Sequence, residues 1–454
     1  DGKLPYDVLA YLCTGNCDSV ADRLMETSLF TVEGTDLKVI HNLVYDCMKK
    51  LSSPIRQARI AETLIKGYQN GDVPLENSQT KMFELSFYAG HYKFVLDESK
   101  TLFGYLLKEH EYYSVIKYTS LAHQSLDRMP YMEQDDFARS EILVTKLFSY
   151  AQLHIFETPD VVNGLNALET ILNLNKYDTR FVPTKLWYLW LKWYVNFYTG
   201  QIAESFQTIS AAKSIVDNGR FEEQLCGQIY WAYGLSHKRL TTLEQGICDF
   251  KEGLGKYPGS ILLKYAVDGH EAHQYLRSDP QKTNVMCRKL VSLIENTDCF
   301  YNEVLQARVD VAMSAFYSGD YESALGEAQR DYEIARANSI SFQEGRSMTI
   351  IAACYLMNRD IENAFWTFKK ARHCFDESGN HLFMWRPSFS IGQIYYRTGE
   401  IDKALEHYEK FLDHEIMNLE ERLPNLTLRN CELACLVYIA RIYRENGRHK
   451  EADA

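Results

Sequence analysis

Hydrophobic and polar positions follow a helical period along most of this chain, and from residue 190 onward the same pattern returns several times. In the clearest copy, the apolar residues of 389–395 share one helix face, and those of 401–412 share a face of a second helix. Gly399 lies between them, where a left-handed residue ends the first helix. A small or aromatic marker recurs at intervals of about 40 residues, at Trp193, Gly234, Ala272, Ala312, Ala352, Gly392 and Ala440. The sequence therefore predicts stacked helical hairpins over 190–454, each with two helices of roughly a dozen residues.

Residue types also recur in a fixed order within each copy. Gly392 is followed by Tyr395, Gly399, Ala404 and Tyr408, so the order is small residue, aromatic, turn glycine, alanine, aromatic. This order resembles the tetratricopeptide repeat (TPR). The resemblance implies an all-α, right-handed, TPR-like solenoid, with a concave groove lined mainly by the first helix of each hairpin. A step longer than the usual TPR length of about 34 residues implies longer helices or longer connections.

The stretch 66–189 keeps a helical pattern, but the repeat positions are harder to align there than after residue 190. Gly90-His91-Tyr92 is typical of a repeat turn, and Glu111–Tyr118 is typical of the start of a second repeat helix. We therefore predict degenerate helical hairpins over 66–189 that continue the same solenoid.

Residues 1–65 have a different pattern. Two short predicted helices, Asp7–Cys13 and Asp18–Thr27, precede β-rich runs at Ser28–Val32 and Leu37–Ile40, which flank a turn. Helices followed by a two-stranded wing indicate a small winged-helix-like segment. Further helices are predicted over 42–50 and, with proline in its first turn, over 54–68.

The order of three stretches, Lys38–Asp46, Leu51–Arg56 and Ile60–Leu64, resembles the end of the core of the STAND class of signal-transduction ATPases. There a winged-helix domain closes over a nucleotide domain and superhelical repeats follow. The resemblance implies that His41 contacts the β-phosphate of bound ADP in the resting state. This chain departs from the pattern in three ways: Asn42 replaces a common acid, a second His after the Arg is absent, and no G-x-x-x-x-G-K-[ST] occurs. Any ATP or ADP site, and any oligomerisation through it, would therefore belong to a missing upstream domain. The alternative is a half-buried His41 that begins an ordinary helix.

The expected ligand surface is the concave groove of the array. Arginine and aromatic residues together suit a protein or peptide ligand, because arginine binds carboxylates and aromatics give apolar anchors. The alternative is that these side chains pack between neighbouring hairpins. The positions expected to face the groove are Phe316, Arg346, Arg386, Phe389, Gln393, Tyr396, Arg441 and Arg444.

The composition of the chain limits the kinds of partner that it is expected to bind. A net charge of −12, with no run of five basic residues, argues against nucleic acid as the partner. No apolar run approaches the length of a membrane span. Eleven scattered cysteines indicate a reducing compartment, so we expect a cytoplasmic protein.

Motifs for catalysis and metal binding are absent from the sequence, so we expect a non-catalytic chain without a cofactor of its own. The pairs Cys13/Cys17 and Cys431/Cys435 lack a second pair at zinc-site spacing and favour buried thiols. His270 and His273 lie three apart, and they too lack further ligands, which favours surface histidines.

Three interpretations of function remain. In the first, the chain is the sensor region of a STAND-type regulatory ATPase, whose groove binds a protein, peptide or inducer. In the second, it is a free-standing TPR scaffold or peptide receptor that mediates protein–protein interactions. A third reading makes it an accessory region of a multidomain enzyme.

Overall fold

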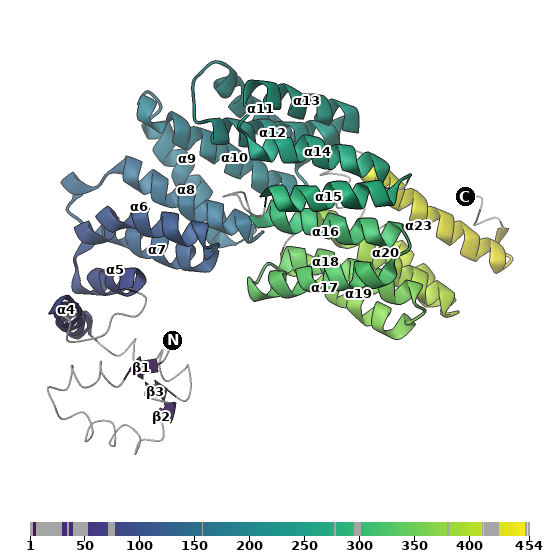
Figure 1. Ribbon diagram of the computed structural model, residues 1–454, viewed down its shortest axis with the longest axis horizontal. Helices are drawn as coiled ribbons and strands as arrows, with labels where there is room; N and C mark the ends of the chain where they lie inside the picture. Colours follow the sequence, from purple (N-terminus) through teal and green to yellow (C-terminus); the bar gives the residue numbers. More distant parts are fainter. Residues whose placement is uncertain are drawn as a thin grey trace. The chain divides into compact units, whose positions relative to one another are not determined.

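The structure is a computed structural model. It describes residues 3–5, 30–33, 36–39, 53–70, 78–156, 158–276, 278–294, 301–378, 381–410, 412, 426–449 and 452 (Figure 1). The chain divides into two compact units, Asp1–Lys146 and Leu147–Ala454. This division falls inside the stretch 66–189, and the domain limits proposed from the sequence stay a prediction.

Unit 1 begins with a small antiparallel sheet of strand order β1-β3-β2. Strand β2 (Phe30–Glu33) pairs with β3 (Asp36–Val39), which confirms the hairpin predicted from the β-rich runs. Strand β1 (Lys3–Pro5) pairs with the other edge of β3 and was not predicted, because three residues carry no alternating pattern. The helices predicted over 7–13, 18–27 and 42–50 lie outside the described residues, as does His41.

The rest of unit 1 is helical, and α4 (Pro54–Asn70) confirms the helix predicted over 54–68. Gly90, with φ of 85°, forms the predicted turn between α5 and α6. Phe83, Val95 and Val115, from three successive helices, lie in one apolar core. The remaining elements are α5 (Ser78–Ala89), α6 (Tyr92–Lys108), α7 (Tyr112–Arg128), η1 (Tyr131–Glu133) and α8 (Asp136–Gln152), the last of which extends into unit 2.

Unit 2 consists of helical hairpins in which each helix packs against the next in sequence (Figure 1). First helices also contact one another, as α10 and α12 do. Every repeat marker predicted from the sequence lies on a first helix, so the described hairpins form a TPR-like α-solenoid. The elements are α9 (Pro159–Leu174), η2 (Thr179–Phe181), α10 (Val182–Tyr198), α11 (Ile202–Asp217), α12 (Glu223–Leu240), α13 (Leu243–Lys256), α14 (Ile261–Tyr275), α15 (Pro280–Ile294), α16 (Tyr301–Tyr317), α17 (Tyr321–Ala337), α18 (Ser341–Met357), α19 (Ile361–Glu377), α20 (His381–Arg397), α21 (Ile401–Lys410) and α23 (Leu426–Glu445).

The predicted helix length of about a dozen residues was too short. Helices α16 to α20 each have 17 residues. The long repeat step is therefore taken up by longer helices, while the turns within hairpins stay short. Among the described residues, no helix is long and apolar enough to cross a membrane.

The turns within hairpins share one backbone geometry, with a left-handed residue before the second helix. Gly399 has φ of 80°, and the next residue's N–H donates to the carbonyl of Tyr395 at 2.9 Å. Arg359 takes the equivalent place with φ of 65°, a conformation that is uncommon for a residue with a side chain. Asp360 then caps the second helix by accepting a hydrogen bond from the backbone N–H of Asn363 at 3.2 Å. The helix ends are thus fixed by local chemistry visible in the sequence.

The two helices of a hairpin approach closely at the repeat markers. A Cβ atom added to Gly392 would lie 2.5 Å from a ring carbon of Tyr408, and one added to Gly234 would lie 2.5 Å from the ring of Phe250. These distances are too short for any real contact, so glycine is required where a large aromatic fills the hairpin.

Candidate functional site

The first helices of unit 2 bring together a group of charged and aromatic side chains. Gln306, Arg346 and Arg386 stand at equivalent positions of three successive hairpins, on α16, α18 and α20. Arg346 donates a hydrogen bond to the Gln306 side-chain oxygen, 40 residues away in sequence. Gln306 in turn donates to Asp310 at 3.0 Å. Hydrogen bonds therefore link Arg346 on α18 to Gln306 and Asp310 on α16.

Arg346 is a buried member of this group. Its side chain is only 8% exposed, and its guanidinium carbon lies 5.9 Å from the ring of Phe342 and 5.6 Å from the ring of Phe383. Burial lowers its pKa, the Asp310 carboxylate raises it, and the nearby Arg386 lowers it again. A guanidinium stays charged in proteins, so Arg346 places a permanent positive charge beneath this surface.

Two further arginines share the surface. Arg386 is exposed, and Arg239 at the end of α12 is half-buried. Burial lowers the pKa of Arg239, Tyr198 raises it, and Arg386 lowers it. Tyr198 and Tyr265 also act on the pKa of Arg346. We call the set Tyr198, Arg239, Tyr265, Asp310, Arg346 and Arg386 the first-helix cluster; its three arginines exceed its single carboxylate, so its net charge is positive.

Lys238 lies next to Arg239 in the last turn of α12. Burial and the neighbouring Arg239 lower its pKa to about 7, against an opposing effect of Asp310. Its amino group lies 2.7 Å from His270 Nε2. His270 Nδ1 lies 2.8 Å from the carbonyl oxygen of Ala266, so Nδ1 donates there and Nε2 accepts from the lysine. His270 is thus half-buried and hydrogen-bonded, and the expectation of a surface histidine was wrong for it.

Aromatic rings border the cluster. His154 lies 4.3 Å from Phe342 and 4.8 Å from Tyr198, measured between ring centroids. Burial and the charge of Arg346 lower the pKa of His154 to about 3, so this ring is neutral. Its Nδ1 has no hydrogen-bond partner, and its backbone is left-handed with φ of 53°. Such strained, buried polar residues are frequent beside binding sites.

The predicted groove residues fall into two groups. Arg346 and Arg386 both belong to the first-helix cluster. The others except Arg444 make contacts within or between hairpins: Phe389 lies 5.5 Å from Tyr438 between ring centroids, and Gln393 donates to the Tyr438 hydroxyl at 2.9 Å. Arg441 and Tyr396 both bond to Glu445, Phe316 lies against Tyr321, and Arg444 is exposed on α23.

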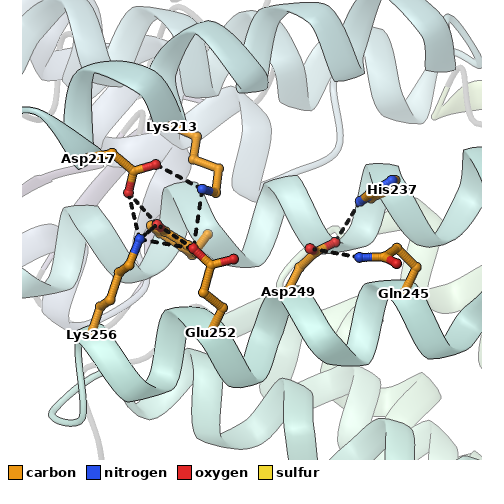
Figure 2. Close-up of polar contacts among 8 residues, drawn as sticks. Lys213, Asp217, His237, Gln245, Asp249, Glu252 and Lys256 are labelled. Atoms are coloured by element: carbon orange, nitrogen blue, oxygen red, sulfur yellow. Dashed lines mark hydrogen bonds and ion pairs between the residues drawn. The ribbon is translucent and has the colours of Figure 1, made fainter.

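A second polar network joins α11, α12 and α13 (Figure 2). The buried Tyr230 hydroxyl donates to Asp217 and accepts from Lys256 at 2.6 Å. Lys213 donates to Asp217 at 2.8 Å, and Lys256 donates to Glu252 at 2.9 Å. Burial raises the pKa of Asp217, but hydrogen bonds from Lys213, Tyr230 and Lys256 outweigh burial and lower it to about 2. Two lysines balance two carboxylates, so this network ties three helices together and leaves no net charge for a ligand.

His237 and Asp249 form a further pair in the same view (Figure 2). His237 Nδ1 lies 2.8 Å from Asp249 Oδ2, and Gln245 donates to the other carboxylate oxygen at 3.5 Å. The His237 ring also lies 5.2 Å from that of Phe206. This contact links α11, α12 and α13 in the same way. Within the described ranges, no group of three or more histidine, cysteine or carboxylate side chains could hold a metal ion.

Sequence reasoning missed Tyr198, Arg239, Tyr265 and Asp310. Tyr198 and Arg239 each lie five residues after a repeat marker, whereas Tyr265 and Asp310 lie at two other positions relative to theirs, so no single repeat position marks all four. The equivalence of Gln306, Arg346 and Arg386 was available from the sequence and could have identified one row of the cluster. Convergence of side chains from six first helices depends on the winding of the solenoid, which the repeat step alone does not give.

These helices, turns and marker contacts define the chain as a TPR-like solenoid. No protein-family model matches the sequence, and no curated protein does. Similar solved structures include a Rap protein complexed with competence and sporulation factor, at TM-score 0.46 and 13% identity over 70% of this chain and 95% of that one. Another is NprR in complex with its cognate peptide NprX, at TM-score 0.47 and 11% identity over 69% of this chain and 87% of that one.

A third similar structure is a STAND protein with a tetratricopeptide repeat sensor from Pyrococcus horikoshii, at TM-score 0.39 and 14% identity. It matches 100% of this chain, which covers 59% of that protein. These identities and scores are too low to transfer any residue role, and the fold stands on the geometry described above.

Proposed function

We propose that this chain is a ligand-binding TPR region whose first-helix cluster binds a protein or peptide. The observation that carries the proposal is the convergence of Arg239, Arg346 and Arg386 with Tyr198 and Tyr265. Ordinary hairpin packing does not require several arginines on one surface, because charged side chains are expensive to bury. Arginine and tyrosine are also the residues that dominate protein-binding surfaces.

We further propose that the binding event regulates a STAND-type ATPase, with this chain as its sensor region. Support comes from the hairpin of β2 and β3 followed by α4, in the order that this class has before its repeats. His41 would report bound ADP in that arrangement. The alternative is a free-standing TPR scaffold or peptide receptor without a nucleotide switch.

The binding proposal is tested with peptides selected from a displayed random library against the full 454-residue chain. Hydrogen–deuterium exchange then maps the selected peptide. We expect protection in α12, α16, α18 and α20, and none from an unselected peptide of equal length. Protection confined to the second helices α13, α17 and α19 would contradict the proposal.

The regulatory proposal is tested on the natural reading frame. It requires an upstream phosphate-binding loop, and a frame that starts near residue 1 would favour the scaffold. Where the loop exists, His41→Ala in the longer protein should weaken ADP retention and raise basal activity. Unchanged ADP content would remove His41 from this role.

A further inference from the structure

Lys238 and His270 form a pair that joins the end of α12 to α14. The Lys238 amino group lies 2.7 Å from His270 Nε2. Because His270 Nδ1 donates to the carbonyl oxygen of Ala266 at 2.8 Å, the neutral ring keeps an unprotonated Nε2 toward the lysine. The amine therefore faces a base that can accept one of its protons, which is how a nucleophile and its general base are arranged.

Helix α13 holds both side chains of this pair in place. A Cβ atom added to Gly246 would lie 2.5 Å from the Cβ of Lys238, so glycine is needed where the lysine stem passes. The fully buried ring of Phe250 lies 5.0 Å from the His270 ring, measured between centroids. Lys238 itself is only half-buried. The pair is therefore fixed by the packing of three helices, while solvent still reaches part of the lysine side chain.

The surroundings of Lys238 disfavour its protonated form. Burial and the neighbouring Arg239 lower its pKa to about 7, and the opposing effect of Asp310 is smaller. Across the part of the chain that the structure describes, no carboxylate forms an ion pair with Lys238. A product without a positive charge is therefore favoured at this nitrogen. An amide is such a product, and its remaining N–H can still donate to His270 Nε2.

We infer that Lys238 is a site of acylation by small acyl thioesters, with His270 as its general base. The lysine nitrogen attacks the thioester carbonyl carbon and forms the N–C bond, while His270 Nε2 takes the proton that the amine loses. The C–S bond then breaks, and the leaving thiolate recovers that proton as a thiol. The thioester is the only other reactant. This modification site goes beyond the peptide-binding function proposed above and does not depend on it.

The inference is tested on the full chain with S-acetyl-N-acetylcysteamine, an uncharged acyl thioester, near neutral pH. Hydroxylamine then removes acyl groups from cysteines, and peptide mass spectrometry gives the acetylation rate at each lysine. Lys251, which is exposed on α13, is the reference. We expect Lys238 to react about tenfold faster than Lys251 or more, because a much larger share of its amine is neutral and its general base is in place.

The dependence of this rate on pH is a second measurement on the unaltered chain. Because the pKa of Lys238 is about 7, its neutral form is nearly fully populated above about pH 8, and the acetylation rate should level off there. An ordinary exposed lysine gains rate up to about pH 10. A Lys238 rate that still rises steeply at about pH 10 would overturn the inference.

The matched variants are His270→Phe, which keeps a ring against Phe250 but removes Nε2, and His373→Phe, which removes an exposed histidine on α19. His270→Phe should lower the acetylation rate at Lys238 about tenfold or more, the scale of lost general-base assistance. His373→Phe should leave that rate unchanged, and circular dichroism checks that both variants are folded. A Lys238 rate equal to that of Lys251 in the unaltered chain would overturn the inference. A folded His270→Phe variant with an unchanged rate at Lys238 would overturn it as well.

Discussion

The imidazole of His154 packs on the ring of Phe342, with centroids 4.3 Å apart and 34° between the ring planes. His154 follows α8, and Phe342 lies in the first turn of α18, so the contact joins hairpins that are distant in sequence. The ring of Tyr198, at the end of α10, also packs against Phe342, with ring centroids 6.1 Å apart. Aromatic packing therefore joins α18 to the first helices of unit 2, beside the first-helix cluster.

Replacement of His154 should show what this contact contributes. His154→Ala removes a ring that is 1% exposed and should lower the free energy of unfolding by about 3 kcal/mol, as for other buried aromatic truncations. His154→Phe keeps the ring and should cost about 1 kcal/mol or less. Chemical denaturation measures both. Equal losses in the two variants would mean that the ring contact is not what stabilises this region.

The burial of His154 should also make the stability of the chain depend on pH. The pKa of His154 falls from 6.5 to about 3 on folding, because burial and Arg346 disfavour the charged ring. Between these pH values the unfolded chain binds a proton that the folded chain does not, so stability falls as the pH is lowered. His154→Phe should therefore flatten the loss of thermal stability between pH 7 and pH 5. An unchanged slope would show that His154 is not buried in its neutral form.

For Asp331 we expect stability to change with pH in the opposite direction. It is 2% exposed, its Oδ2 has no hydrogen-bond partner, and burial raises its pKa from 3.8 to about 7. Between these values the folded chain binds the additional proton, so stability falls as the pH rises. Asp331→Asn should raise the melting temperature at pH 8 by roughly 2–4 °C or more, with little effect at pH 4. The exposed Asp376→Asn serves as control, and an equal response in both variants would contradict the assignment.

The fold was largely predictable because its determinants are local. Turn residues such as Gly399, the caps of second helices and the apolar spacing all act within a single hairpin, where sequence patterns are direct evidence. The cluster was only half predictable. Arg346 and Arg386 were identified, but Arg239 and Tyr198 belong to distant hairpins, and their approach depends on small rotations accumulated over several repeats. Strand β1 was missed because its three residues have no period of their own.

The network of Figure 2 should behave as one unit. Tyr230→Phe removes the hydroxyl that connects Asp217 and Lys256, and should cost about 1–2 kcal/mol of unfolding free energy. The double variant with Lys256→Met should lose less than the sum of the single losses, because both remove the same contact. The exposed Tyr131→Phe is the control and should change little. Additive losses would show that the hydroxyl and the lysine act independently.

The close approach of first and second helices gives a last prediction, in which a second substitution should restore part of the lost stability. Gly392→Ala should destabilise the hairpin of α20 and α21, because its Cβ would lie 2.5 Å from the Tyr408 ring, which is fully buried and cannot withdraw. Gly326→Ala is the matched control, since Gly326 is also helical but its Cβ would meet nothing within 4 Å. That control should gain up to about 1 kcal/mol from helix propensity alone. Combining Gly392→Ala with Tyr408→Leu should recover part of the loss, since the smaller side chain makes room for the new methyl group. Thermal unfolding of the four proteins compares them, and a Gly392→Ala variant as stable as the control would show that this hairpin does not require glycine at its crossing point.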